Sequence, residues 1–125
     1  ELTRRPDGPP PAAARPAAPR WVLTPEGGAP FAVERDTLIG RLPDAGLRPG
    51  AAVLAVDDPQ FTVSKTHAVV TQEPPGLWIE DLDSTHGVVV RRKGDEMRLD
   101  PRRPTRLLDG DTVILGAFAI SVVAG

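Results

Sequence analysis

The segment of residues 63–87 contains two polar clusters at either end of two apolar runs. The first cluster is Val63-Ser64-Lys65-Thr66-His67 and the second is Asp81-Leu82-Asp83-Ser84-Thr85-His86-Gly87. The two apolar runs between them have the pattern of short strands and flank the turn signal Pro74-Pro75-Gly76. A hairpin of these strands would bring side chains from both clusters within reach of one ligand.

The rest of the chain consists of further short apolar runs between turn signals. Signals such as Pro25-Glu26-Gly27-Gly28 and Asp109-Gly110 recur at short intervals. No stretch repeats its apolar residues with the 3.6-residue period of a helix. The pattern therefore predicts an all-β sandwich, with strands at residues 21–24, 31–34, 37–41, 52–56, 67–71, 77–82, 88–91, 106–108, 111–116 and 118–123.

The composition fits a soluble globular domain and excludes several kinds of protein. The chain has 125 residues, which suits one domain, with 40% hydrophobic and 26% charged residues. Because cysteine is absent, the chain can form no disulfide and no cysteine-based metal site or nucleophile. The net charge of −2 gives no overall basic field for nucleic acid. No apolar run approaches the length of about 18 residues that would predict a membrane span.

The first 20 residues differ in composition from the rest of the chain. Residues 9–20 contain only Pro, Ala and Arg, and this density of proline favours an extended, polyproline-like conformation. We therefore expect residues 1–20 to be a disordered linker and residues 21–125 to be the folded domain. The chain starts with Glu1, which indicates a piece of a longer protein, and its richness in Arg, Ala, Pro and Gly is typical of a GC-rich, bacterial genome.

Four motifs occur in the order in which forkhead-associated (FHA) domains carry them. They are Ile39-Gly40-Arg41, Val63-Ser64-Lys65-Thr66-His67-Ala68, Asp81-Leu82-Asp83-Ser84-Thr85-His86-Gly87 and Leu108-Asp109-Gly110-Asp111-Thr112-Val113-Ile114-Leu115-Gly116. Each motif alone is weak, but the four together make residues 21–124 resemble an FHA domain. The resemblance implies a two-sheet β-sandwich of about eleven short, mostly antiparallel strands, whose loops at one end bind phosphothreonine peptides.

The residue types in these motifs suit a phosphorylated threonine. A phosphothreonine carries a charge of roughly −1.5 to −2 and three acceptor oxygens, so its site needs a fixed cation and several neutral donors. By resemblance, the phosphate would be bound by Arg41, Ser64 and Lys65, and the peptide by Thr85 and His86. In isolation, each of these residues has an ordinary explanation as a solvated charge or as a turn former that bonds local backbone.

Three further residues would support the site. Gly40 and Gly87 are expected where the backbone needs freedom or close approach. By resemblance, His67 would brace the binding loops by hydrogen bonds.

His86 occupies a position at which the family pattern has asparagine. An asparagine amide offers a donor and an acceptor together, whereas a neutral imidazole carries one of each on opposite sides of its ring. Three outcomes are open. His86 could bond the peptide more weakly through one nitrogen, it could attract the phosphate when protonated, or the domain could have lost phosphopeptide binding and kept its scaffold.

Three other functions compete with this interpretation. A hydrolase triad of Ser64, His67 and Asp81 lacks suitable spacing and a nucleophile elbow, so we expect no enzyme. A calcium loop that starts at Asp81 would have its glycine one position late and Arg92 in place of the final Glu. We therefore expect no metal, and expect Asp81 and Asp83 to cap the turn or to pair with nearby Arg. A phosphate-independent interaction module stays open.

The expected partner is a phosphothreonine-containing protein, either a Ser/Thr kinase or its substrate. We expect no cofactor, no nucleic acid and no membrane contact, a monomeric domain and a cytoplasmic location within a larger protein. The loop of residues 42–51 and the run Arg91-Arg92-Lys93 are candidates for setting the ligand preference. The charged run fits a solvated hairpin end better than a site for acidic ligand residues.

Overall fold

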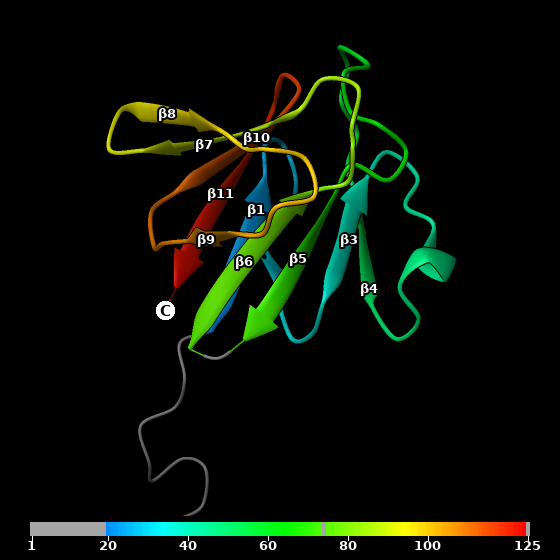
Figure 1. Ribbon diagram of the computed structural model, residues 1–125, viewed down its shortest axis with the longest axis horizontal. Coiled ribbons are helices and arrows are strands. Elements are labelled where there is room, and N and C mark those ends of the chain that lie inside the picture. Colours follow the sequence, from blue (N-terminus) through cyan, green and yellow to red (C-terminus); the bar gives the residue numbers. More distant parts are fainter. Residues whose placement is uncertain (1–19, 74, 125) are drawn as a thin grey trace, which may run out of the picture.

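The computed structural model describes residues 20–73 and 75–124, which form two β-sheets packed face to face (Figure 1). The six-stranded sheet has the order β2-β1-β11-β10-β7-β8, and the five-stranded sheet has the order β4-β3-β5-β6-β9. This arrangement confirms the predicted all-β sandwich. The strands are β1 (Trp21–Pro25), β2 (Phe31–Ala32), β3 (Thr37–Gly40), β4 (Ala52–Ala55), β5 (Ala68–Glu73), β6 (Gly76–Asp81), β7 (Val88–Arg92), β8 (Asp95–Arg98), β9 (Thr105–Leu107), β10 (Thr112–Leu115) and β11 (Phe118–Ala124).

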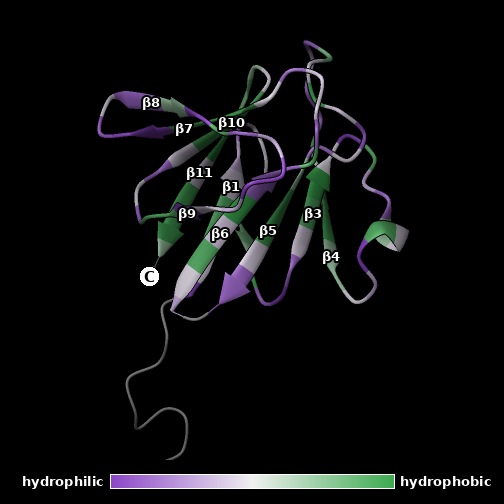
Figure 2. Ribbon diagram, viewed as in Figure 1, coloured by the Kyte–Doolittle hydropathy of each residue, from purple (hydrophilic) through white to green (hydrophobic). Residues whose placement is uncertain are grey.

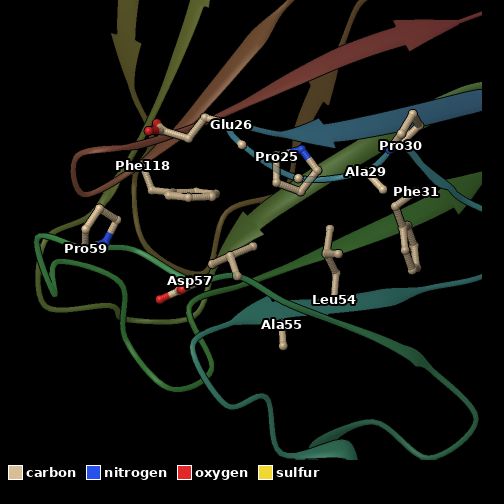
Figure 3. Close-up of a pocket in the computed structure, with 13 residues that line it drawn as sticks. Pro25, Glu26, Ala29, Pro30, Phe31, Leu54, Ala55, Asp57, Pro59 and Phe118 are labelled. Carbon is tan, nitrogen blue, oxygen red and sulfur yellow. The ribbon is translucent and has the colours of Figure 1, made fainter.

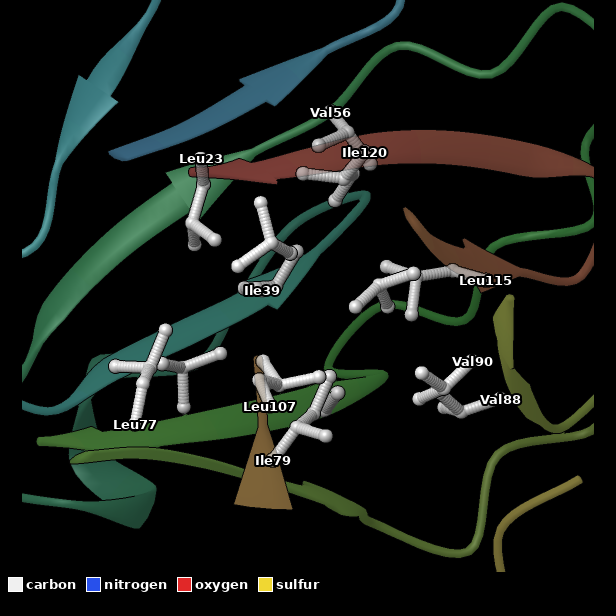
Figure 4. Close-up of a cluster of buried hydrophobic side chains, with 14 of the residues drawn as sticks. Leu23, Ile39, Val56, Leu77, Ile79, Val88, Val90, Leu107, Leu115 and Ile120 are labelled. Carbon is white, nitrogen blue, oxygen red and sulfur yellow. The ribbon is translucent and has the colours of Figure 1, made fainter. Parts of the chain in front are cut away.

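The hydrophobic core lies between the two sheets. Buried and more exposed residues alternate along β1 and through most of β11, because successive side chains of a strand point to opposite faces. Figure 4 shows side chains from both sheets meeting in this layer, and Figure 2 shows polar residues gathered in the loops and in β8. Each fully buried Leu or Ile stabilises the fold by roughly 1.5–3 kcal/mol. Those with at most 1% of their surface exposed in this layer include Leu23, Ile39, Leu77, Ile79, Leu107, Leu115 and Ile120.

The hairpin expected within residues 63–87 is formed by β5 and β6. The two strands are antiparallel, and their register pairs Ala68 with Asp81. Beyond this pair, the Leu82 N–H donates to the carbonyl oxygen of His67 at 3.0 Å. The two polar clusters of the sequence therefore lie side by side at one end of the sheet.

Strand β8 was not predicted from the sequence, because all four of its residues are exposed and three of them are charged. It pairs with β7 through a tight turn at Lys93 and Gly94, both of which have positive φ, 51° and 86°. The run Arg91-Arg92-Lys93 lies at this hairpin end, as expected. Strand β8 is stabilised by its backbone hydrogen bonds to β7, and its sequence has no apolar pattern that would predict a strand.

The turn at Asp109-Gly110 joins strands of different sheets. Strand β9 before it pairs with β6, whereas β10 after it pairs with β7 and β11. The Asp111 N–H donates to the Leu108 carbonyl oxygen at 3.1 Å, so the tight turn is formed. The turn carries the chain from one layer of the sandwich to the other.

An ion pair between the buried Asp111 carboxylate and the partly exposed Arg92 guanidinium follows this turn. The Asp111 side chain is 1% exposed and accepts two hydrogen bonds from the Arg92 guanidinium, at 2.9 and 2.8 Å. Burial opposes ionisation of Asp111, but the bonds from Arg92 and from the Leu108 N–H outweigh it and lower the pKa of this carboxyl. The pair thus fixes the crossing between the sheets.

The loop between β3 and β4 contains a short 3-10 helix, Ala45–Leu47, which the sequence did not indicate. Asp44 caps it by accepting the Gly46 N–H at 2.9 Å, and the Asp44 N–H donates to Thr66 Oγ1 at 3.0 Å. In residues 20–73 and 75–124, no helix has the length and apolar character needed to cross a membrane. Of the expected linker, only Arg20 lies within the described residues.

Candidate functional site

Three loops meet at one end of the five-stranded sheet, the upper end in Figure 1. They are the loop after β3, the loop before β5 and the loop after β6. The sheet register brings them together, because Ile39 pairs with Ala68 and Ala68 pairs with Asp81. Every residue that the sequence assigned to the site lies in or beside these loops.

Arg41 is held against the loop before β5 by backbone hydrogen bonds. The Arg41 N–H donates to the Ser64 carbonyl oxygen and the Leu42 N–H to the Lys65 carbonyl oxygen, both at 3.0 Å. Gly40 permits this approach, since a Cβ at that position would lie 2.0 Å from the Lys65 carbonyl oxygen. The Arg41 residue itself is exposed, so its guanidinium is available to a ligand.

Ser64 connects the loop before β5 to the loop after β6. Its Oγ accepts a hydrogen bond from the Thr85 N–H at 3.2 Å. The Ser64 hydroxyl proton can therefore still be donated to a ligand. The Thr85 N–H is thereby already engaged, so Thr85 presents its exposed side chain to a ligand.

The buried side chain of His67 connects the same two loops. It is fully buried, its Nδ1 accepts the Ser64 N–H at 2.9 Å, and its Nε2 lies 2.8 Å from the Gly87 carbonyl oxygen. These partners require a neutral ring that carries its proton on Nε2. Burial lowers the pKa of His67, although the bond to Gly87 and the nearby charge of Asp81 act in the opposite direction.

The loop after β6 is shaped by its own short side chains. The buried Asp81 carboxylate accepts the Ser84 N–H and the Ser84 hydroxyl accepts the Gly87 N–H, both at 2.9 Å. Gly87 has a φ of 80°, and a Cβ there would lie 2.5 Å from the Arg98 guanidinium. Asp83 pairs with Arg102 at 2.9 Å. The two carboxylates thus cap and pair as the sequence predicted.

A cavity of about 400 Å³ opens where these loops meet. It brings together four of the five residues assigned to ligand binding, namely Arg41, Ser64, Thr85 and His86, and Lys65 does not line it. Lys65 is exposed on the same loop. The remaining lining residues are Phe61, Thr62 and Val63. Sequence reasoning missed Phe61 and Thr62, because a Phe and a Thr in a loop carry no pattern.

A larger cavity, of about 690 Å³, lies between the turn after β1 and strand β4 (Figure 3). Its walls are mainly apolar, with Phe31, Leu54 and Phe118 among them. Its two charged residues, Glu26 and Asp57, are both acidic. This charge would repel a phosphate, so the smaller cavity beside Arg41 is the better anion site.

The arrangement of Ser64, His67 and Asp81 differs from that of a hydrolase triad. Both ring nitrogens of His67 bond backbone groups, and the Ser64 Oγ bonds the Thr85 N–H. A general base would have to accept the Ser64 hydroxyl proton instead. Within the described residues, no three His, Asp or Glu side chains are grouped so that they could hold a metal ion.

A family model of the FHA domain matches residues 37–116, which is more than half of the chain. No curated protein sequence matches the chain. Among solved structures, one FHA domain, from a structural and functional analysis of phosphothreonine-dependent FHA domain interactions, is 23% identical. That match covers 83% of this chain and 95% of the other, with a TM-score of 0.59.

Two further solved structures contain phosphorylated peptides. The FHA domain of human APLF in complex with an XRCC1 bisphospho peptide is 24% identical, over 83% of this chain and 97% of that chain, with a TM-score of 0.63. Mycobacterium tuberculosis EmbR in complex with a low affinity phosphopeptide is 26% identical, over 83% of this chain and 24% of that chain, with a TM-score of 0.60. The fold agrees in each case, and the family match over residues 37–116 shows that the chain belongs to the FHA domain family.

Proposed function

We propose that this FHA domain binds phosphothreonine-containing proteins and so mediates phosphorylation-dependent protein–protein interaction in Ser/Thr kinase signalling. The observation that carries the proposal is the cavity that Arg41 and Ser64 share with Thr85 and His86. Similar solved structures support it, since the FHA domain of human APLF is in complex with a bisphospho peptide and EmbR with a phosphopeptide.

The phosphate would be bound by Arg41, Ser64 and Lys65. A guanidinium offers a rigid fork of donors that matches phosphate oxygens, and the Ser64 hydroxyl has a proton to donate while its oxygen accepts the Thr85 N–H. The backbone bonds from residues 41 and 42 to residues 64 and 65 pre-organise these groups. Lys65 would add a second positive charge from the rim of the cavity.

The peptide chain would be bound by Thr85 and His86, which are both exposed beside the phosphate-binding residues. Gly40, His67 and Gly87 would support the site without touching the ligand. FHA domains are interaction modules, and we propose neither a catalytic activity nor a cofactor for this chain. The partner would be a Ser/Thr kinase or its substrate, met by a monomeric domain in the cytoplasm.

The alternative is an FHA-fold interaction domain whose phosphopeptide binding is weakened or lost. His86 favours this alternative, because an imidazole cannot offer a paired donor and acceptor as an asparagine amide does. In the described part of the chain, no hydrogen bond fixes the His86 ring. Its orientation on the peptide would therefore be set by the ligand.

Calorimetry with a peptide selected from a degenerate phosphothreonine library tests both functions. We expect binding that disappears when the threonine is not phosphorylated. Arg41→Ala should cost about 2–5 kcal/mol, as for truncation of one partner of a buried charge pair. Arg48→Ala is the matched control, because Arg48 belongs to the same loop but pairs with Asp36 at 2.8 Å. Equal binding of phosphorylated and unphosphorylated peptides would favour the alternative.

A further inference from the structure

Phe61 combines two unusual features in the loop that precedes β5. Its surface is 81% exposed, the largest fraction among the large apolar residues of the described chain. Its φ is 56°, in the left-handed region that bulky side chains rarely adopt. An exposed ring buries little apolar surface, and this backbone conformation costs free energy. Strain at a residue that contributes so little to the core points to a role other than folding.

The turn around Phe61 holds it in this conformation. The nearly buried Asp58 carboxylate accepts the N–H groups of Gln60 at 2.9 Å and of Thr62 at 2.6 Å, which flank Phe61. The Phe61 N–H donates to the Asp58 carbonyl oxygen at 3.0 Å. The hydrogen bond from the Thr62 hydroxyl lowers the pKa of Asp58 against the opposing effect of burial. The carboxylate is therefore charged at neutral pH and bonds strongly.

Thr62 ties the same turn to the six-stranded sheet. Its Oγ1 accepts the Ala117 N–H at 2.8 Å, from the turn between β10 and β11. The chains are in close contact there, since a Cβ at Gly116 would lie 2.5 Å from Thr62 Oγ1. Phe61 thus projects from a turn that is anchored on both sides, and a ligand would bind it at a low cost in conformational entropy.

Phe61 also lines the cavity that contains Arg41, Ser64, Thr85 and His86. Three residue steps separate Phe61 from Ser64, so their Cα atoms lie at most about 11 Å apart. An extended peptide covers that distance in about three residues. A peptide whose phosphate is bound beside Ser64 would therefore bring a neighbouring side chain to the Phe61 ring.

We propose that Phe61 is a specificity-determining residue, which binds an apolar side chain within three residues of the phosphothreonine. This inference rests on the proposed function of the same site. The ring is the large exposed apolar group of this cavity, since Val63 is buried and the other lining residues are polar or charged. An aliphatic ligand side chain that removes about 60 Å² of apolar surface from water on the ring should gain about tenfold in affinity.

A position-scanned phosphothreonine library, varied at the three residues on each side of the phosphothreonine, tests the inference. We expect the wild-type domain to select Leu, Ile or Met at one position. Peptides with Leu or Ala at that position are then compared by calorimetry. Wild type should prefer Leu about tenfold, and Phe61→Asn should bind both peptides about equally. Asparagine is chosen because it tolerates the left-handed backbone, so the turn is kept.

Leu47→Ala is the matched control, because Leu47 is 62% exposed and lies outside this cavity. It should keep the wild-type preference. A preference that persists in Phe61→Asn, or wild-type binding without any apolar preference, would overturn the inference and leave the proposed function intact. Absence of all phosphopeptide binding by wild type would overturn both. A merely structural role predicts instead that Phe61→Asn loses stability to urea and weakens both peptides alike, which would also overturn it.

Discussion

Replacing Gly40 with alanine should destabilise the fold and at the same time displace the loops of the candidate site. Gly40 is fully surrounded at the end of β3, and an added Cβ would lie 2.0 Å from the Lys65 carbonyl oxygen and 2.7 Å from its carbonyl carbon. The Ser64 carbonyl oxygen would be 3.0 Å away. These neighbours are backbone atoms, so no side-chain rotation can relieve the clash.

The loss of stability can be estimated from the two backbone hydrogen bonds that join the segment after Gly40 to Ser64 and Lys65. To restore an ordinary contact distance, the segment of Ser64 and Lys65 must retreat by more than 1 Å, which breaks or weakens the bonds that Arg41 and Leu42 donate to it. Each bond contributes about 0.5–1.5 kcal/mol, and overpacking adds typically 1–3 kcal/mol. Gly40→Ala should therefore lose about 2–6 kcal/mol of unfolding free energy.

Urea unfolding followed by the fluorescence of Trp21 and Trp78 measures this loss, and peptide calorimetry measures its effect on the site. Gly28→Ala is the matched control, because a Cβ there would meet its nearest atom at 3.4 Å, an ordinary contact. That variant should stay within about 0.5 kcal/mol of wild type. If Gly40→Ala were as stable as Gly28→Ala, the close approach of the two loops would be refuted.

Three further predictions concern charge. Burial lowers the pKa of His67 below its ordinary value of about 6.5, so His67 takes up a proton more readily in the unfolded chain than in the folded one. The free energy of unfolding should therefore be at its full value above about pH 6.5 and should fall as the pH drops below it. Urea titrations should find this pH dependence in His86→Asn but not in His67→Gln. If protonated His86 attracts the phosphate, the ratio of wild-type to His86→Asn affinity should rise as the pH falls from about 8 to 5.5, whereas a constant ratio would exclude this role. Arg92→Met should cost about 1.5–3 kcal/mol because it leaves the buried Asp111 carboxylate without its ion pair, whereas Arg91→Met, which removes an exposed pair, should cost at most about 1 kcal/mol in the same urea experiment.

The sandwich could be predicted from the sequence because its core strands have a recognisable residue pattern. Residues of β5, β6, β10 and β11 combine β-branched and apolar side chains with turn residues at their ends. Strand β8 could not be predicted, since every residue in it is exposed and its pairing with β7 supplies the stabilisation. An apolar pattern in the sequence marks strands with a buried face, and an edge strand whose side chains are all exposed leaves no such pattern.

The candidate site was predicted through the resemblance to FHA domains, because an Arg or a Ser in a loop has an ordinary explanation in isolation. Arg41 and Ser64 match the family's motifs, their residue types suit a phosphate, and both line the cavity. Phe61 was missed because its significance lies in a φ of 56° and an exposure of 81%, which only the folded turn around Asp58 creates. The bond from the Thr85 N–H to Ser64 could not be predicted for the same reason, since it depends on how two loops meet.

The two halves of the site differ in how firmly the fold holds them, and this difference separates affinity from selectivity. Ser64 is fixed by three bonds, through its carbonyl oxygen to Arg41, its N–H to His67 and its hydroxyl to Thr85. A phosphate would meet these groups already in position, so binding there costs little reorganisation. His86, by contrast, is exposed and has no hydrogen bond within the described residues. Substitutions around Ser64 should therefore weaken all phosphopeptides alike, whereas substitutions at His86 should change which peptide is preferred.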